Sequence, residues 1–304
     1  KTDMHSNLWV FPRGMKRNGE TGENSLEWTS RYGSVVTSAF EIASTDGMNE
    51  KGLVANLLWL PETEYPVRDK NKPGLAITAW VQYMLDNFAT VEEAVAYIDE
   101  DTFQVVSDMM PDGSRLATLH LSISDATGDC AIFEYIGGKL TVYHSKEYKV
   151  MTNSPTYNKQ LALSEYWKSI GGLSFLPGTN RAADRFARAS FYINALPETD
   201  DERIAVASVF SVVRNASVPY GISTPESPEI STTQWRTVSE SKNLRYFFES
   251  SLTPNTFWVN LKDFDLSEGA PVFKLSIANG EMYHGNTAKN FKTALPFKFM
   301  GVKG

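Results

Sequence analysis

Residues 116–124 (LATLHLSIS) alternate apolar and polar side chains, and this pattern constrains the fold more than any other stretch. A period of two is typical of a strand that buries one face. The turn-forming run of residues 125–129 (DATGD) follows, and a second strand-like run covers residues 130–135. Two such runs joined by a short turn predict an antiparallel hairpin. Further strands at residues 140–144 and 148–152 are expected to extend it into a meander.

Strand-like patterns also occur near both ends of the chain. Residues 34–40 alternate, Asp46-Gly47 is expected to form a turn, and residues 52–60 form a near-continuous apolar run. Such a run is typical of a strand buried on both faces. Four strands are expected near the C-terminus, at residues 237–238, 244–249, 256–261 and 272–277.

Helical patterns separate the two groups of strands. The expected helices cover residues 75–88, residues 90–98, a segment from Ser154, a segment from Thr179 or Asn180, and residues 200–213. Thr90 and Glu93 form a capping box. Ser154 is expected to be an N-cap, with Pro155 at the first helical position. This order of strands and helices favours an α+β fold in which helices cover the sheets.

The composition is that of an ordinary globular protein and excludes several functions. Hydrophobic residues make up 42% of the 304 residues and charged residues 21%. The net charge is −7 and no basic tract is present, which argues against nucleic acid as a partner. No apolar run is long enough for a membrane span. Four scattered histidines and one cysteine match no metal-ligand spacing, so neither a metal nor an organic cofactor is expected.

Two hydrogen-bond donors, Asn153 and Arg185, lie at the entrances of two expected helices, about thirty residues apart. Neither side chain is a nucleophile, so a site built from them stabilises developing negative charge. The structural alternatives are an Asx turn at Asn153, a solvated salt-bridged helix face at Arg185, and a core position for Trp59. Cys130 lies in a strand-like apolar run and is expected to be a core residue. The chain contains no GxSxG motif, which argues against a serine hydrolase.

Segments along nearly the whole chain together resemble the choloylglycine hydrolase family, which contains bile salt hydrolases and penicillin V acylases. The matching segments are NLWVFPRGM (7–15), WTSRYGSV (28–35), DGMNEKGL (46–53), TNSP (152–155), LPGTNR (176–181), DRF (184–186), RNASVP (214–219) and YFFES (246–250). The set is most similar to the Gram-negative branch that includes Bacteroides-type bile salt hydrolases. The resemblance implies the four-layer αββα sandwich of N-terminal nucleophile (Ntn) hydrolases. Residues 1–304 would form one such domain, lacking the family's first strand.

The resemblance also implies a catalytic mechanism. In this family an N-terminal cysteine attacks the amide carbonyl, and its own α-amino group serves as the base. Asn153 would supply an oxyanion-hole donor from its side chain, and Trp59 occupies the position whose backbone N–H completes the hole. Arg185 would lie beside the nucleophile. The nucleophile is expected about twenty residues upstream of Lys1, so we expect either an omitted N-terminal segment or an inactive chain.

The implied reaction is hydrolysis of a linear amide between a bulky hydrophobic acyl group and a small polar amine, through a thioester. Conjugated bile salts are the favoured substrates, and penicillin V and N-acyl homoserine lactones are the alternatives. A catalytically inactive binding protein on the same scaffold is an alternative of another class. Trp59 stands where Gram-positive bile salt hydrolases carry Asn, which changes the substrate pocket. The resemblance further implies a homotetramer and a periplasmic or secreted location.

Overall fold

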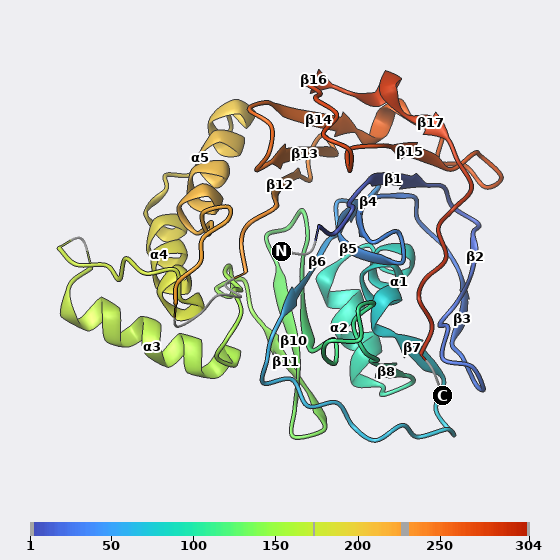
Figure 1. Ribbon diagram of the computed structural model, residues 1–304, viewed down its shortest axis with the longest axis horizontal. Coiled ribbons are helices and arrows are strands. Elements are labelled where there is room, and N and C mark those ends of the chain that lie inside the picture. The colour runs from blue at the N-terminus through green and yellow to red at the C-terminus, as the bar shows by residue number, and fades with distance from the viewer. Residues whose placement is uncertain (1–2, 173, 226–230, 303–304) are drawn as a thin grey trace.

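The computed structural model describes residues 3–172, 174–225 and 231–302, and its centre is a nine-stranded sheet (Figure 1). The strand order is β11-β10-β9-β6-β5-β4-β1-β15-β17, and all neighbouring strands are antiparallel. The strands are β1 (Leu8–Phe11), β4 (Ser34–Ala39), β5 (Ala43–Asn49), β6 (Val54–Trp59), β9 (Leu119–Ser124), β10 (Cys130–Ile136), β11 (Lys139–His144), β15 (Phe273–Leu275) and β17 (Lys292–Thr293).

A four-stranded sheet is stacked on one face of the large sheet. Its order is β12-β13-β14-β16, formed by β12 (Trp235–Glu240), β13 (Arg245–Ser250), β14 (Thr256–Asn260) and β16 (Gly285–Asn286). The remaining strands form two short two-stranded sheets. One pairs β2 (Lys16–Asn18) with β3 (Glu27–Thr29), and the other pairs β7 (Gly74–Ala76) with β8 (Gln104–Val106).

Helices pack against both of the stacked sheets. They are α1 (Trp80–Asn87), α2 (Val91–Asp99), α3 (Tyr157–Ile170), α4 (Ala182–Ala195) and α5 (Glu202–Asn215), with short 3-10 turns η1 (Ile77–Ala79), η2 (Leu261–Asp263) and η3 (Ala288–Asn290). Figure 1 shows α3, α4 and α5 grouped together, away from α1 and α2.

Buried apolar side chains define the layers. One cluster joins α1 and α2 to the large sheet and includes Trp80, Met84 and Leu121. A second cluster, which includes Val35 and Phe248, lies between the two sheets. Helix α5 covers the outer face of the small sheet, where the rings of Phe210 and Phe247 meet edge to face. The four-layer αββα arrangement predicted from the sequence is therefore present.

The expected turn at Asp46-Gly47 was wrong, because both residues lie inside β5. The chain reverses earlier, at Phe40 and Glu41, which both have φ of 53°. A Cβ on Gly47 would lie 2.5 Å from the Val35 carbonyl oxygen, so glycine is needed there for close packing of neighbouring strands. The glycine that indicated a turn is therefore required inside a strand.

Three other expected elements also differ. Residues 75–79 form β7 and a 3-10 turn, so the α-helix begins at Trp80. The expected strand at 148–152 is absent, because Tyr148 and Val150 pack against a small buried cluster instead of pairing in a sheet. Ser154 and Pro155 precede α3, whose N-cap is Thr156.

Candidate active site

Trp59, Asn153 and Arg185 come from three separate segments and meet in one chain of hydrogen bonds. Trp59 ends β6, Asn153 lies in the loop before α3, and Arg185 lies in the first turn of α4. Asn153 Nδ2 donates to the Trp59 carbonyl oxygen at 2.7 Å. Arg185 Nη2 donates to Asn153 Oδ1, also at 2.7 Å. The three residues named from the sequence are thus brought together.

The orientation of the Asn153 amide follows from its two partners. A guanidinium can only donate and a carbonyl oxygen can only accept, so Oδ1 must face Arg185 and Nδ2 must face Trp59. Nδ2 carries two hydrogens, and within the described residues one of them is bonded to Trp59. Polarisation of Oδ1 by Arg185 makes the second N–H a stronger donor, and its role toward an oxyanion stays a prediction.

The backbone of Trp59 faces the same amide. Leu60 N–H donates to the Thr118 carbonyl at 3.0 Å, so the N–H of Leu60 points toward β9. Backbone groups of successive residues point to opposite edges of a strand, so the N–H and C=O of Trp59 point away from β9. Pairing of β5 with β6 stops at Asn56, which leaves this side of Trp59 open to Asn153. The role of the Trp59 N–H in an oxyanion hole stays a prediction.

Arg185 is a half-buried cation that does not take the neighbouring Asp184 as its partner. Its Nε donates to the Asn180 carbonyl at 3.1 Å, while Asp184 accepts from Thr179. Burial first, and then the charge of Arg188, lower the pKa of Arg185. Guanidinium groups nevertheless stay charged in proteins, so the cation remains beside the amide. Arg185 is therefore not part of a solvated salt-bridged face.

The loop that carries Asn153 is fixed by polar side chains whose contacts the sequence patterns did not predict. Gln160 Nε2 donates to the carbonyl of Asn153 and, at 2.6 Å, to that of Pro155. Ser154 Oγ donates to Glu62, in the loop that follows β6. In the sequence, Gln160 is only a glutamine near the start of an expected helix, and its burial, with 1% exposure, became visible only in the structure.

The indole of Trp59 is held on two sides. Its Nε1 donates to Thr118 Oγ1 at 3.0 Å, and the Arg115 guanidinium lies 3.9 Å from the ring centroid. The side chain is half-buried rather than a core residue. The indole is therefore held in a fixed orientation, with one ring face covered by Arg115.

Cys130 is not activated as a nucleophile by its surroundings. Cys130 is partly buried, and burial, followed by the charges of Asp129 and Asp125, raises the pKa of its thiol to about 11. Such a thiol is protonated at neutral pH and is a poor nucleophile. Within these residues, no cluster of three histidine, cysteine or acidic side chains has metal-binding geometry. No described helix is long and apolar enough to cross a bilayer.

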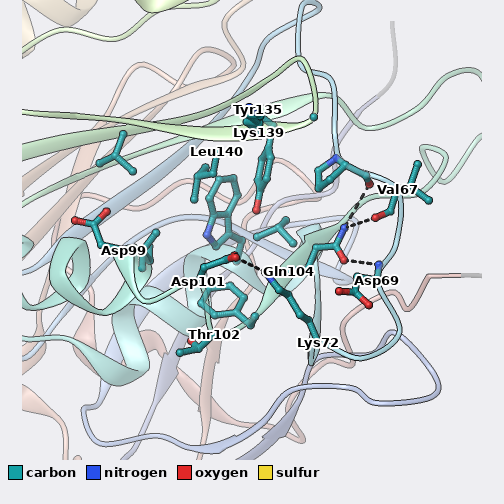
Figure 2. A pocket seen from close by; sticks show the side chains of 17 residues that line it. Val67, Asp69, Lys72, Asp99, Asp101, Thr102, Gln104, Tyr135, Lys139 and Leu140 are labelled. Carbon is teal, nitrogen blue, oxygen red and sulfur yellow. Dashed lines mark hydrogen bonds and ion pairs between the residues drawn. The ribbon is translucent and has the colours of Figure 1, made fainter.

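A separate hollow of about 420 Å³ opens near α2, β8 and the loop before β7 (Figure 2). Figure 2 shows Gln104 bonded to the backbone at Val67 and Asp69, and Lys72 paired with Asp101. None of the three candidate site residues lines this hollow. Because Gln104, Lys72 and Asp101 are already bonded to protein partners, we do not assign the amide chemistry to this hollow.

Sequence comparisons agree with this geometry. Residues 1–274 match the family model described as linear amide C–N hydrolases, choloylglycine hydrolase family. The chain is 50% identical to the penicillin V acylase of Pectobacterium atrosepticum, over 99% of this chain and 86% of that protein. It is 28% identical to the bile salt hydrolase/transferase of Clostridium perfringens, over 72% of this chain and 73% of that protein.

Solved structures with a similar fold come from the same two groups of enzymes. The penicillin V acylase of Agrobacterium tumefaciens superposes with a TM-score of 0.93 at 55% identity, over 99% of this chain and 93% of that one. A conjugated bile acid hydrolase from Clostridium perfringens superposes with a TM-score of 0.76 at 23% identity, over 90% of each chain, and shows the shared fold. These likenesses confirm the predicted Ntn hydrolase sandwich. The Bacteroides-type branch stays a prediction.

Proposed function

Because the chain belongs to the choloylglycine hydrolase family of linear amide C–N hydrolases, we propose that it cleaves penicillin V or a related amide with an aromatic acyl group. Two similar proteins, at 50% and 55% identity over nearly the whole chain, are penicillin V acylases. The bile salt hydrolase/transferase is only 28% identical over a shorter alignment. Substrate specificity depends on pocket side chains, so the more similar proteins are the better guide.

The hydrogen-bond chain Trp59–Asn153–Arg185 is the observation that carries this proposal. Amide hydrolysis passes through a tetrahedral intermediate whose oxygen becomes anionic. A fixed N–H donor with a cation behind it stabilises that oxygen more than the neutral carbonyl. Asn153 is proposed to donate from its side chain and Trp59 from its backbone. Arg185 holds the amide and contributes positive charge.

The proposed attacking group is the thiolate of an N-terminal cysteine that lies outside the 304 residues. Its thiolate would add to the amide carbonyl, and its α-amino group would take the thiol proton. Collapse of the intermediate breaks the C–N bond and releases the protonated amine, which leaves a thioester. Water then cleaves the thioester to the carboxylic acid and restores the thiol. Cys130 has no part in this sequence of steps.

The fixed indole of Trp59 supports an aromatic acyl group. One face of the ring is covered by Arg115, and the side chain is anchored to Thr118. A flat acyl ring gains from offset or edge-to-face contact with an indole, by about 0.5–1.5 kcal/mol beyond its buried area. Conjugated bile salts, the substrates favoured from the sequence, are the second candidate. The similarity to the bile salt hydrolase/transferase supports them.

Parallel kinetics on the full-length natural protein test the proposal. Penicillin V, glycocholate, taurocholate and an N-acyl homoserine lactone are compared by kcat/KM, with release of the free amine or lactone as the readout. We expect penicillin V to give the highest value. A higher value for either bile salt would replace the aromatic substrate with the steroid one. No hydrolysis of any of the four would favour an inactive binding protein.

A further inference from the structure

A histidine–glutamate pair is completely buried beneath the loop that carries Asn153 and leads into α3. His120 on β9 and Glu134 on β10 both have 0% side-chain exposure. They are neighbours across the ladder, because the register that pairs Leu121 with Phe133 continues to the next positions. Leu121 and Phe133 face the core formed with α1 and α2. Since side chains alternate along a strand, the buried pair faces the opposite side, toward α3.

The pair connects both ends of the loop. His120 Nε2 lies 3.0 Å from the Thr152 carbonyl oxygen, and His120 Nδ1 lies 2.9 Å from Glu134 Oε1. The backbone N–H of Tyr157 donates to both oxygens of Glu134, at 3.2 and 3.0 Å. The residue before Asn153 and the first residue of α3 are therefore held by one pair.

These contacts fix the positions of the protons. A carbonyl oxygen only accepts, so His120 Nε2 must carry a hydrogen. Nδ1 faces a Glu134 oxygen that already accepts from Tyr157, and two facing lone pairs would repel, so a second proton lies between the ring and the carboxylate. The pair is then neutral overall, as burial requires. Burial raises the pKa of the nearby Tyr143 and Tyr157, so these hydroxyls stay uncharged.

From this geometry we propose that His120 and Glu134 are positioning residues that hold the Asn153 amide in its working orientation. The inference rests on the proposed function, in which that amide contacts the oxyanion. His120 fixes the carbonyl of Thr152, which precedes Asn153, and Gln160 fixes the carbonyl of Asn153 itself. A misplacement of about 1 Å at a reacting centre costs on the order of 10²-fold in rate. The pair therefore acts on kcat through Asn153.

Three variants test the positioning role. We expect His120→Leu and Glu134→Leu to lower kcat about 10²-fold, because the loop loses its anchor. KM should change little, since the residues proposed to contact substrate are retained. Glu134→Gln is the conservative rescue, because its amide can donate to Nδ1 and accept from Tyr157. We expect it to keep kcat near the wild-type value.

A matched control is a buried carboxylate away from the loop. Asp86 is 0% exposed and accepts from Trp28 and Gln82, which lie with α1 on the other side of the large sheet. Asp86→Asn should lower Tm without lowering kcat. If its kcat falls as far as that of His120→Leu, or if His120→Leu keeps the wild-type kcat, the positioning role is rejected.

Nitrogen-15 NMR tests the same inference without a substrate. His120 Nε2 should carry a hydrogen both in the wild type and in Glu134→Gln, because it faces the Thr152 carbonyl oxygen. The Asn153 side-chain amide should give two well-separated signals that shift in His120→Leu. A wild-type Nε2 without a proton, or unshifted Asn153 signals, would overturn the inference. Absence of amidase activity would instead reject the proposed function, and these spectra would still decide the role of the pair.

Discussion

Asn153→Asp separates catalysis from stability more cleanly than any other change in the candidate site. Aspartate has the shape of asparagine and retains an oxygen for Arg185, whose bond to Oδ1 is 2.7 Å long. It loses the Nδ2 donor, and the second oxygen then faces the Trp59 carbonyl. The variant therefore keeps the cationic partner but replaces the oxyanion donor with a negative charge.

The expected magnitudes follow from these two contacts. Removal of one oxyanion donor costs about 10²–10³ in kcat, equivalent to about 2.7–4 kcal/mol. The stability cost is the lost hydrogen bond to Trp59 together with the unfavourable contact between two acceptor oxygens, about 1–3 kcal/mol, and the new ion pair with Arg185 offsets part of it. Asn153→Ala loses the Arg185 bond as well, so it should be less stable by about 2 kcal/mol or more.

Steady-state kinetics and thermal unfolding of both variants provide the assay. Asn153→Asp should lose at least about 10²-fold in kcat on the best amide substrate while its Tm stays close to the wild-type value. Asn153→Ala should lose a similar factor in kcat and several degrees in Tm. If Asn153→Asp hydrolyses the substrate within about tenfold of the wild-type rate, the amide is not the oxyanion donor and the proposed mechanism fails.

Three further outcomes are expected. Arg185→Lys cannot reach both Asn153 and Asn180, and the loss of one charged hydrogen bond should lower kcat by about 10- to 100-fold; unchanged kinetics would contradict this role. Cys130→Ser should leave kcat unchanged, because a thiol with a pKa of about 11 is protonated at neutral pH. A large loss of kcat would indicate that Cys130 is a nucleophile. Burial raises the folded-state pKa of Asp46, so the native state binds its proton more tightly than the unfolded state does. The free energy of unfolding should therefore fall as pH rises from the unfolded-state pKa of about 3.9 toward the raised pKa. Asp46→Asn should flatten this decline in denaturant titrations at several pH values, and an unchanged slope would show that Asp46 does not cause it.

Local patterns predicted the elements whose partners are close in sequence. One half of the capping box was confirmed, since Thr90 Oγ1 accepts from the Glu93 backbone N–H at 3.2 Å, but the Glu93 side chain accepts from the Ala89 N–H instead of that of Thr90. The hairpin of β9 and β10 was confirmed for the same reason. Strand β1 was missed, because it lies between β4 and β15 and its partner Leu275 is far along the chain from Leu8. Such pairing leaves no local pattern.

The sequence predicted the central residues of the candidate site but not the buried pair that supports them. The chemistry of Asn153 and Arg185, two donors without a nucleophile, indicated anion stabilisation, and the structure places them in contact. The His120–Glu134 pair left only a weak signal, a histidine in an alternating strand. Its contact with Thr152 depends on how the loop folds back over the sheet. That path is set by tertiary packing and cannot be read from spacing.

Helices α3 and α4 meet the large sheet through a small cluster of their own, built around Ile132, Tyr157 and Phe186. It is separate from the two larger cores, and α3 also leaves Tyr166 and Ile170 about half exposed. Regions with few buried apolar contacts open at a lower free energy than the whole protein. Mild heating should therefore detach these helices by subglobal opening while both sheets persist. Amide hydrogen exchange would be faster in α3 than in β9, and heat inactivation would precede global unfolding.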